Sequence, residues 1–151
     1  MIFLTKYLIF AFKIFLTTLL AYIIGHNRQK KNLPVGGRTH VIVALIALLV
    51  QTGGAFGGDI LRLSGQFLTG IGFLCSGIIF KSPDVTKVRG LTTSAVIFYC
   101  GVVGITIGLG LYVETIIVTL VVLFFLYDPL KFEKSHNFNK RRKSNERNNF
   151  K

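Results

Sequence analysis

The chain has little charge overall and very little negative charge. Of its 151 residues, 16% are charged, and only six are Asp or Glu against 18 Lys or Arg. A soluble domain typically carries about 25% charged residues, whereas here 51% of the residues are hydrophobic and the mean hydropathy is +0.59. This composition excludes a disordered chain and a soluble enzyme of ordinary composition. It predicts an integral membrane protein.

Catalytic motifs are also missing. No P-loop lysine follows the glycines, no two histidines stand four residues apart, and no G-x-S-x-G nucleophile elbow occurs. The two cysteines, Cys75 and Cys100, fall in apolar stretches, where a small polarizable side chain packs well. The sequence therefore predicts neither an enzyme nor a cofactor, and it gives no support for a disulfide.

Carboxylates are absent from the middle of every apolar stretch. Asp59, Asp84, Glu114 and Asp128 all stand at the edges of these stretches. Magnesium in proteins is usually held by one or two carboxylates together with waters, and a cation pathway through a membrane is normally marked by intramembrane acidic residues. The sequence thus predicts no metal site. It disfavours a magnesium or other small-solute transporter or channel, which remains the alternative.

The apolar residues predict membrane-spanning helices. A helix needs roughly 20 mainly apolar residues to cross the hydrocarbon core. Five stretches carry no charge: Ile14–Asn27, Thr39–Gly58, Leu63–Phe80, Gly90–Val113 and Thr115–Tyr127. The middle three are long enough as they stand. The first becomes so if its helix starts near Tyr7, and the fifth if it begins near Tyr112. We expect an all-α, polytopic bundle of about five transmembrane helices.

The basic residues predict the orientation of this bundle. Fifteen of the 18 Lys and Arg fall in three segments: the loop after the first stretch, the loop after the third, and the residues beyond the fifth. The positive-inside rule places these segments in the cytoplasm, with the N-terminus outside. We expect a transmembrane domain over residues 1–128 and a basic, disordered cytoplasmic tail over residues 129–151. Beside a membrane, this tail suits anionic headgroups better than nucleic acid.

Lys13 interrupts the first apolar stretch. A lone ammonium inside a membrane helix is costly, and the only acidic groups on the predicted external side are Asp59 and Glu114. Pairing with one of them and snorkelling of the ammonium to the headgroups both remain open.

Glycines are concentrated in the third and fourth stretches. Close backbone approach at small residues is what holds membrane helices together. We therefore predict that these two helices form the tight centre of the bundle, with Gly72 and Ser76 packing against Gly104 and Gly108. The predicted packing glycines are Gly70, Gly72, Gly77, Gly104 and Gly108.

Several motifs together resemble the MgtC/SapB family of bacterial inner-membrane proteins. They occur in family order and run IIGHNRQ (23–29), VGGRTH (35–40), Asp59-x-x-Arg62 leading into GQFLTGIGFLCSGIIF (65–80), VRGLTTSA (88–95) and GITIGLGLY (104–112). The sequence departs from the family pattern at Asn27, where an acidic residue is usual, and at Cys75-Ser76. Some members carry a soluble C-terminal domain, and the resemblance here covers the membrane domain only.

The resemblance implies a function. Members are associated with adaptation to magnesium limitation and with virulence, through modulation of other membrane proteins, the ATP synthase being the suggested partner. It implies a multi-pass protein of the bacterial plasma membrane, and it leaves a homo-oligomer open.

The polar residues within the matching motifs are the candidate functional residues. An arginine fork can hold a carboxylate or phosphate with two parallel hydrogen bonds, although basic residues at helix ends also serve as anchors. The threonines and Asp59 can equally cap helices, and Gln66 can bond across helices. The full set is Arg28, Arg38, Thr39, Asp59, Arg62, Gln66, Arg89, Thr92 and Thr93.

Overall fold

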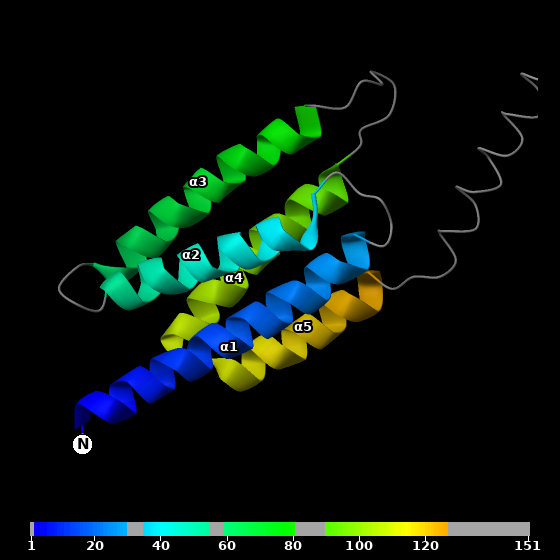
Figure 1. The fold of residues 1–151 in the computed structure, drawn as a ribbon. Coiled ribbons are helices and arrows are strands. Elements are labelled where there is room, and N and C mark those ends of the chain that lie inside the picture. Colours follow the sequence, from blue (N-terminus) through cyan, green and yellow to red (C-terminus); the bar gives the residue numbers. More distant parts are fainter. Residues whose placement is uncertain (1, 30–34, 55–58, 81–89, 127–151) are drawn as a thin grey trace, which may run out of the picture. The chain divides into compact units, whose positions relative to one another are not determined.

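A computed structural model confirms the all-helical fold (Figure 1). The structure describes residues 2–29, 35–54, 59–80 and 90–126. These ranges hold five α-helices and no strand: α1 (Ile2–Gln29), α2 (Gly37–Gly54), α3 (Ile60–Phe80), α4 (Leu91–Leu109) and α5 (Tyr112–Leu126). Each helix falls on one predicted apolar stretch. The first begins at Ile2 rather than near Tyr7, because the residues before Lys13 are also apolar and contain no helix breaker.

Three of these helices are long and apolar enough to cross a membrane. They are Leu4–His26 within α1, the whole of α2 and the whole of α4. The apolar helix α5 has 15 residues and is therefore only about 22 Å long at 1.5 Å per residue. These three helices confirm the prediction of an all-helical protein with helices that can span a membrane. Crossing of the bilayer by α3 and α5 stays a prediction.

The chain divides into two compact units, Met1–Ile116 and Ile117–Lys151, which we describe separately. In the first unit, α2 packs most extensively on α4 and on α1, and α3 packs on α4 and α2 (Figure 1). In the second unit, α5 continues to Leu126, and the rings of Phe124 and Phe125 meet edge to face at 5.8 Å. The predicted tail over residues 129–151 lies outside the described residues.

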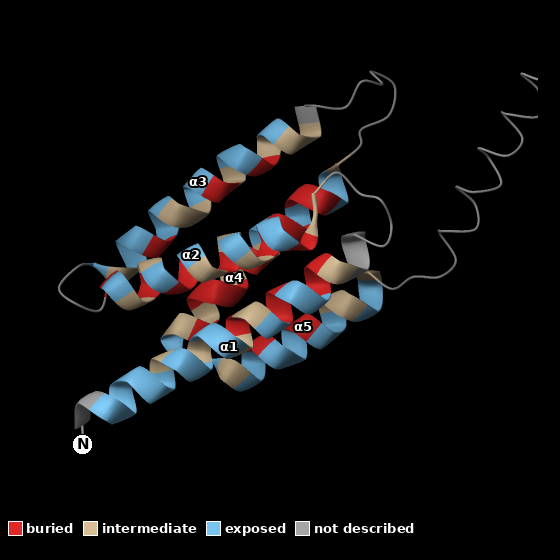
Figure 2. Ribbon diagram, viewed as in Figure 1, coloured by how far each residue is buried: buried red, intermediate tan, exposed pale blue. Residues whose placement is uncertain are grey.

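The core of the first unit contains two apolar clusters. One joins α1, α2 and α4 through Leu20, Leu48, Val103 and Ile107. The other joins α3 and α4 through Ile71, Cys75 and Ile97. Both cysteines are buried, and neither forms a disulfide. Much of the helix surface is exposed (Figure 2). The exposed residues include many Leu, Ile and Phe side chains, as expected where lipid rather than water covers a helix.

The tightest helix contact is between α2 and α4. A Cβ placed on Gly104 would collide with the carbonyl oxygen of Ala44 and would lie 2.6 Å from the Cβ of Ala47. A Cβ on Gly108 would lie 2.6 Å from the Cγ of Gln51. These two glycines therefore lie at a close helix contact, and the helix they contact is α2 and not the predicted α3.

The predicted packing of the α3 glycines on α4 is wrong. A Cβ on Gly70, Gly72 or Gly77 would meet no atom within 4 Å. The physical reason is that α3 turns its larger side chains, Phe67, Ile71 and Ile78, toward the bundle. Glycine content alone did not show which face of the helix would be buried.

Two glycines with positive φ delimit α4. Gly90 precedes the helix with φ 91°, and a Cβ there would lie 3.0 Å from the carbonyl oxygen of Ile78. Gly110 ends the helix with φ 92°, and its N–H bonds to the carbonyl of Ile107 at 3.1 Å, while the N–H of Leu111 bonds to Thr106 at 3.0 Å. Glycine adopts this left-handed conformation without steric cost, which allows the sharp turn from α4 into α5.

Candidate functional site

Lys13 turns into the bundle. Its Nζ donates a hydrogen bond of 2.7 Å to the carbonyl oxygen of Gly108, close to the C-terminal end of α4. The last carbonyls of a helix have no partner within the helix, and the helix dipole places partial negative charge there, so an ammonium is well accommodated. The structure therefore does not show the pairing of Lys13 with Asp59 or Glu114: the ammonium bonds to a backbone carbonyl instead.

Gly108 also contacts Gln51 of α2, on the evidence of the short Cβ distances given above. The Gln51 side chain is buried, and its Oε1 accepts a 2.5 Å hydrogen bond from the Ser64 hydroxyl of α3. Lys13, Gly108, Gln51 and Ser64 thus form a polar layer that joins α1, α4, α2 and α3. A hydrogen bond between two buried side chains is worth about 1–2 kcal/mol in membrane helices.

Two threonines extend this region. The Thr115 hydroxyl lies 2.8 Å from the hydroxyl of Thr106, which joins the start of α5 to α4. Thr17, one turn after Lys13 on α1, is fully buried, and its hydroxyl has no hydrogen-bond partner among the described residues. The polar layer therefore lies in a region of the bundle that contains further buried hydroxyl groups.

A second set of polar contacts lies at the opposite end of α2 and α4. The hydroxyl of Ser94 donates to the carbonyl of Cys75 at 2.8 Å, and the Cys75 thiol donates to the carbonyl of Ser94 at 3.2 Å. Near the start of α2, the buried His40 bonds through Nδ1 to the carbonyl of Gly36 at 2.9 Å. A Cβ on Gly25 of α1 would lie 2.6 Å from the Cα of Gly37, so the two backbones are in contact.

Of the three predicted arginines, Arg38 is the one whose side chain the structure describes. Arg38 is exposed in the first turn of α2. Arg28 falls near the end of α1, where the side chains lie outside the described residues, and Arg89 lies outside them altogether. Binding of an anion by this group therefore stays a prediction.

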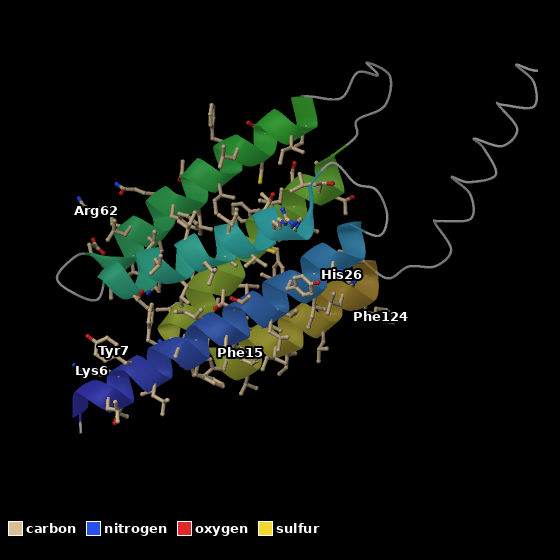
Figure 3. All side chains as sticks on the ribbon, viewed as in Figure 1. Lys6, Tyr7, Phe15, His26, Arg62 and Phe124 are labelled. Atoms are coloured by element: carbon tan, nitrogen blue, oxygen red, sulfur yellow. The ribbon has the colours of Figure 1, made fainter. Side chains whose placement is uncertain are left out.

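Asp59, Arg62 and Gln66 lie together at the start of α3. Asp59 accepts a hydrogen bond of 3.3 Å from the backbone N–H of Arg62 and so caps the first turn of the helix. All three side chains are exposed, and Arg62 extends from the N-terminal end of the helix (Figure 3). None of the three contributes to the polar layer.

The threonines divide by burial. Thr39 and Thr92 are exposed, whereas Thr93 is 2% exposed. The residue before α4 is Gly90, which makes no side-chain cap. Thr92 and Thr93 therefore do not act as the N-cap of α4.

Sequence reasoning missed Gln51, Ser64, Ser94 and Thr17. One signal for Gln51 was available, since it is an amide inside a charge-free stretch of 20 residues. Polar residues in such a stretch usually face the interior of the bundle. Its partner could not be read from the sequence, because the pairing with Ser64 depends on how α2 and α3 are placed side by side.

The chemistry of the site is that of hydrogen bonding between helices. Its groups are an ammonium, an amide, hydroxyls and backbone carbonyls. Within residues 2–29, 35–54, 59–80 and 90–126, no group of three or more His, Cys, Asp or Glu could hold a metal ion. Apolar helices long enough to cross a membrane, joined by glycine contacts and inward-facing polar groups, define a helical integral membrane protein.

Comparison with known proteins identifies the family. The sequence profile of the MgtC family matches residues 14–134. The chain belongs to the MgtC family. No solved structure shows significant similarity to it.

Three relatives illustrate the extent of the similarity. The chain is 35% identical over 114 residues to SapB of Bacillus subtilis, covering 68% of this chain and 48% of SapB. It is 36% identical over 108 residues to MgtC of Brucella abortus, covering 70% of this chain and 44% of that protein. It is 30% identical over 115 residues to YhiD of Escherichia coli, covering 68% of this chain and 52% of YhiD. The chain thus spans about half the length of these relatives.

Proposed function

We propose that this protein is a multi-pass protein of the bacterial plasma membrane that supports adaptation to magnesium limitation, and virulence, by modulating other membrane proteins. The ATP synthase is the proposed partner, by the resemblance to the MgtC/SapB family. The proposal assigns no catalytic step to the chain. Its action is through contact with a neighbour in the membrane.

The observation that carries the proposal is the placement of Lys13. Its ammonium lies against the carbonyl of Gly108, next to the α2–α4 interface that Gly104 and Gly108 close. A fixed positive charge raises the electrostatic cost of moving a cation past it. The polar layer therefore favours a role in holding helices together over a role in carrying Mg²⁺.

Arg38 supplies an exposed group for a partner. It lies in the first turn of α2, on the side predicted to face the cytoplasm, and its guanidinium is exposed. A guanidinium can bind a carboxylate of another protein with two parallel hydrogen bonds. Lys6 is also exposed, but it lies near the other end of the bundle, in the first turns of α1. The two residues therefore make a matched pair for a test.

The test compares inverted membrane vesicles that contain equal amounts of protein. We expect the wild-type chain to change ATP-driven proton pumping and to improve growth of a host at low magnesium. Arg38→Ala is expected to lose both effects, Arg38→Lys to retain part of them, and Lys6→Ala to behave as the wild type. Equal loss in Arg38→Ala and Lys6→Ala would contradict a specific contact, and no effect of the wild type would contradict the modulating role.

Magnesium transport is the second candidate function. It is favoured by the relative YhiD, whose name suggests a magnesium transporter. Purified full-length protein in liposomes that enclose a magnesium-sensitive dye separates the two functions. We expect no flux above that of empty liposomes. A flux that saturates with Mg²⁺ would support transport instead.

A further inference from the structure

The outward face of α3 contains a row of polar side chains, next to the exposed apolar residues Leu61, Phe73 and Leu74. At 100° per residue, Phe67, Ile71 and Ile78, which face the bundle, lie on the side of the helix opposite to Gln66 and Phe73. The outward residues repeat with alternating spacings of three and four, and they are Asp59, Arg62, Gln66, Thr69, Phe73 and Ser76. Among the five helices α3 is the most amphipathic. This row of polar side chains faces away from the protein.

Exposed polar side chains such as the Gln66 amide are costly on a helix surface in contact with lipid. The position of α3 beside α2 and α4 is fixed at both ends, by the Ser64–Gln51 bond and by the pair of bonds between Cys75 and Ser94. These contacts are 11 residues apart, or about 16 Å along the helix. The helix therefore runs alongside α2 and α4, which are both long and apolar enough to cross a membrane. A polar face at this depth requires protein contact.

Gln66 is the clearest case. Its amide is exposed and makes no hydrogen bond to any described residue. The hydroxyls of Thr69 and Ser76 bond within α3, to the carbonyls of Gly65 and Phe73. An amide contains both donors and an acceptor, so it can pair fully with an identical amide.

We propose that the outward face of α3 is a self-association surface that packs against α3 of a second copy of this chain. Two copies in one membrane share their orientation, so a two-fold axis along the membrane normal sets the two helices parallel. Alternating spacings of three and four residues are those of a left-handed helix pair. In this pair Gln66 meets Gln66 of the second copy, and Thr69 meets Thr69.

The charges at the start of α3 complement each other in the same arrangement. Asp59 and Arg62 are exposed on this face, one turn apart, and neither forms an ion pair with a described residue. In this register the two Arg62 side chains lie at one level and the two Asp59 side chains lie one turn away, so each long Arg62 side chain can reach diagonally to the Asp59 of the other copy, which gives two equivalent ion pairs. A partner of different sequence would need its own matching acid and base, and a second copy contains them already.

The glycines of α3 permit the close approach. A Cβ at Gly70 or Gly77 would meet nothing within 4 Å. The helix backbone beside Gln66 and Phe73 is therefore not covered by a side chain at these two positions. Parallel membrane helices approach most closely where such small residues lie at the contact.

Disulfide trapping in native membranes tests the proposal with a matched pair of variants. Thr69→Cys places a thiol on the proposed surface, five residues after Ser64. Ile46→Cys is the control, because Ile46 is 46% exposed on α2, five residues before Gln51, and so lies at the same depth. The native Cys75 and Cys100 are buried and stay in place. We expect oxidation to give a dimer with Thr69→Cys and none with Ile46→Cys or the wild type.

A second variant tests the role of the amide. Gln66→Leu is expected to weaken the dimer by about tenfold, as loss of one interhelical polar contact implies, without changing the thermal stability of the monomer. Dimers in equal amount from both cysteine variants would show random collision and overturn the proposal. So would a Thr69→Cys adduct with a different protein, or a Gln66→Leu dimer as strong as the wild type.

Discussion

The side chain of Lys13 on α1 and the backbone carbonyl of Gly108 on α4 are joined by a hydrogen bond of 2.7 Å, across 95 residues of sequence. This bond places the only basic residue of the central part of α1 against a helix end that carries partial negative charge. It also brings α1 to the layer in which Gln51 and Ser64 join α2 to α3.

Replacement of Lys13 tests this contact. Lys13→Met keeps the length of the side chain but removes the donor, and we expect a loss of about 1.5–3 kcal/mol in the free energy of unfolding, typical of a hydrogen bond to a charged group. Lys6→Met is the control, because Lys6 is exposed. Unfolding in mixed micelles measures the difference. A Lys13→Met protein as stable as the control would show that the bond contributes little.

Gly104 should tolerate no larger residue. Even Gly104→Ala places a Cβ against the carbonyl of Ala44 and the Cβ of Ala47, and overpacking of this kind typically costs about 1–3 kcal/mol. Gly72→Ala is the matched change, since its Cβ would meet open space, and Ala stabilises a helix relative to Gly by up to about 1 kcal/mol. Melting temperatures in detergent should therefore move in opposite directions. A shift of the same sign in both variants would contradict the packing described.

The bond between Gln51 and Ser64 should appear as a coupling energy. We expect Gln51→Ala and Ser64→Ala each to destabilise the protein, and the double variant to cost less than their sum by about 1 kcal/mol. The free energy of unfolding of the four proteins gives the cycle. Thr52→Ala, combined with Ser64→Ala, is the control, because the Thr52 hydroxyl bonds within its own helix. Additivity in the Gln51 cycle would mean that the bond is not formed.

The orientation in the membrane is the fourth prediction. Because 15 of the 18 basic residues fall on one predicted side, a reporter fused after Lys151 should be active only in the cytoplasm. Parallel fusions of a reporter that functions in the cytoplasm and one that functions outside it measure this. Activity of the external reporter alone would reverse the orientation.

The sequence predicts the helices of this protein well and their packing poorly. Charge-free stretches locate all five helices, because the cost of burying charge in a membrane is local information. The helix that packs against Gly104 could not be predicted in this way, since a glycine permits close approach on whichever face the neighbouring helix occupies. Likewise, the sequence leaves open a carboxylate or the headgroups for Lys13, because a carbonyl near the end of α4 becomes its acceptor only once α1 and α4 lie side by side. Gln66 was identified as polar, but its outward direction needed the contacts of Ile71 and Cys75.

The two attachments of α3 restrict how this helix can move. Ser64 is held by α2 near one end, and Cys75 and Ser94 bond to each other near the opposite end. Displacement of α3 along its axis by one helical turn, about 5.4 Å, would break all three hydrogen bonds together. A small tilt of α3 would stretch each of them only slightly. These bonds therefore resist sliding of α3 along its axis more strongly than a change in its tilt.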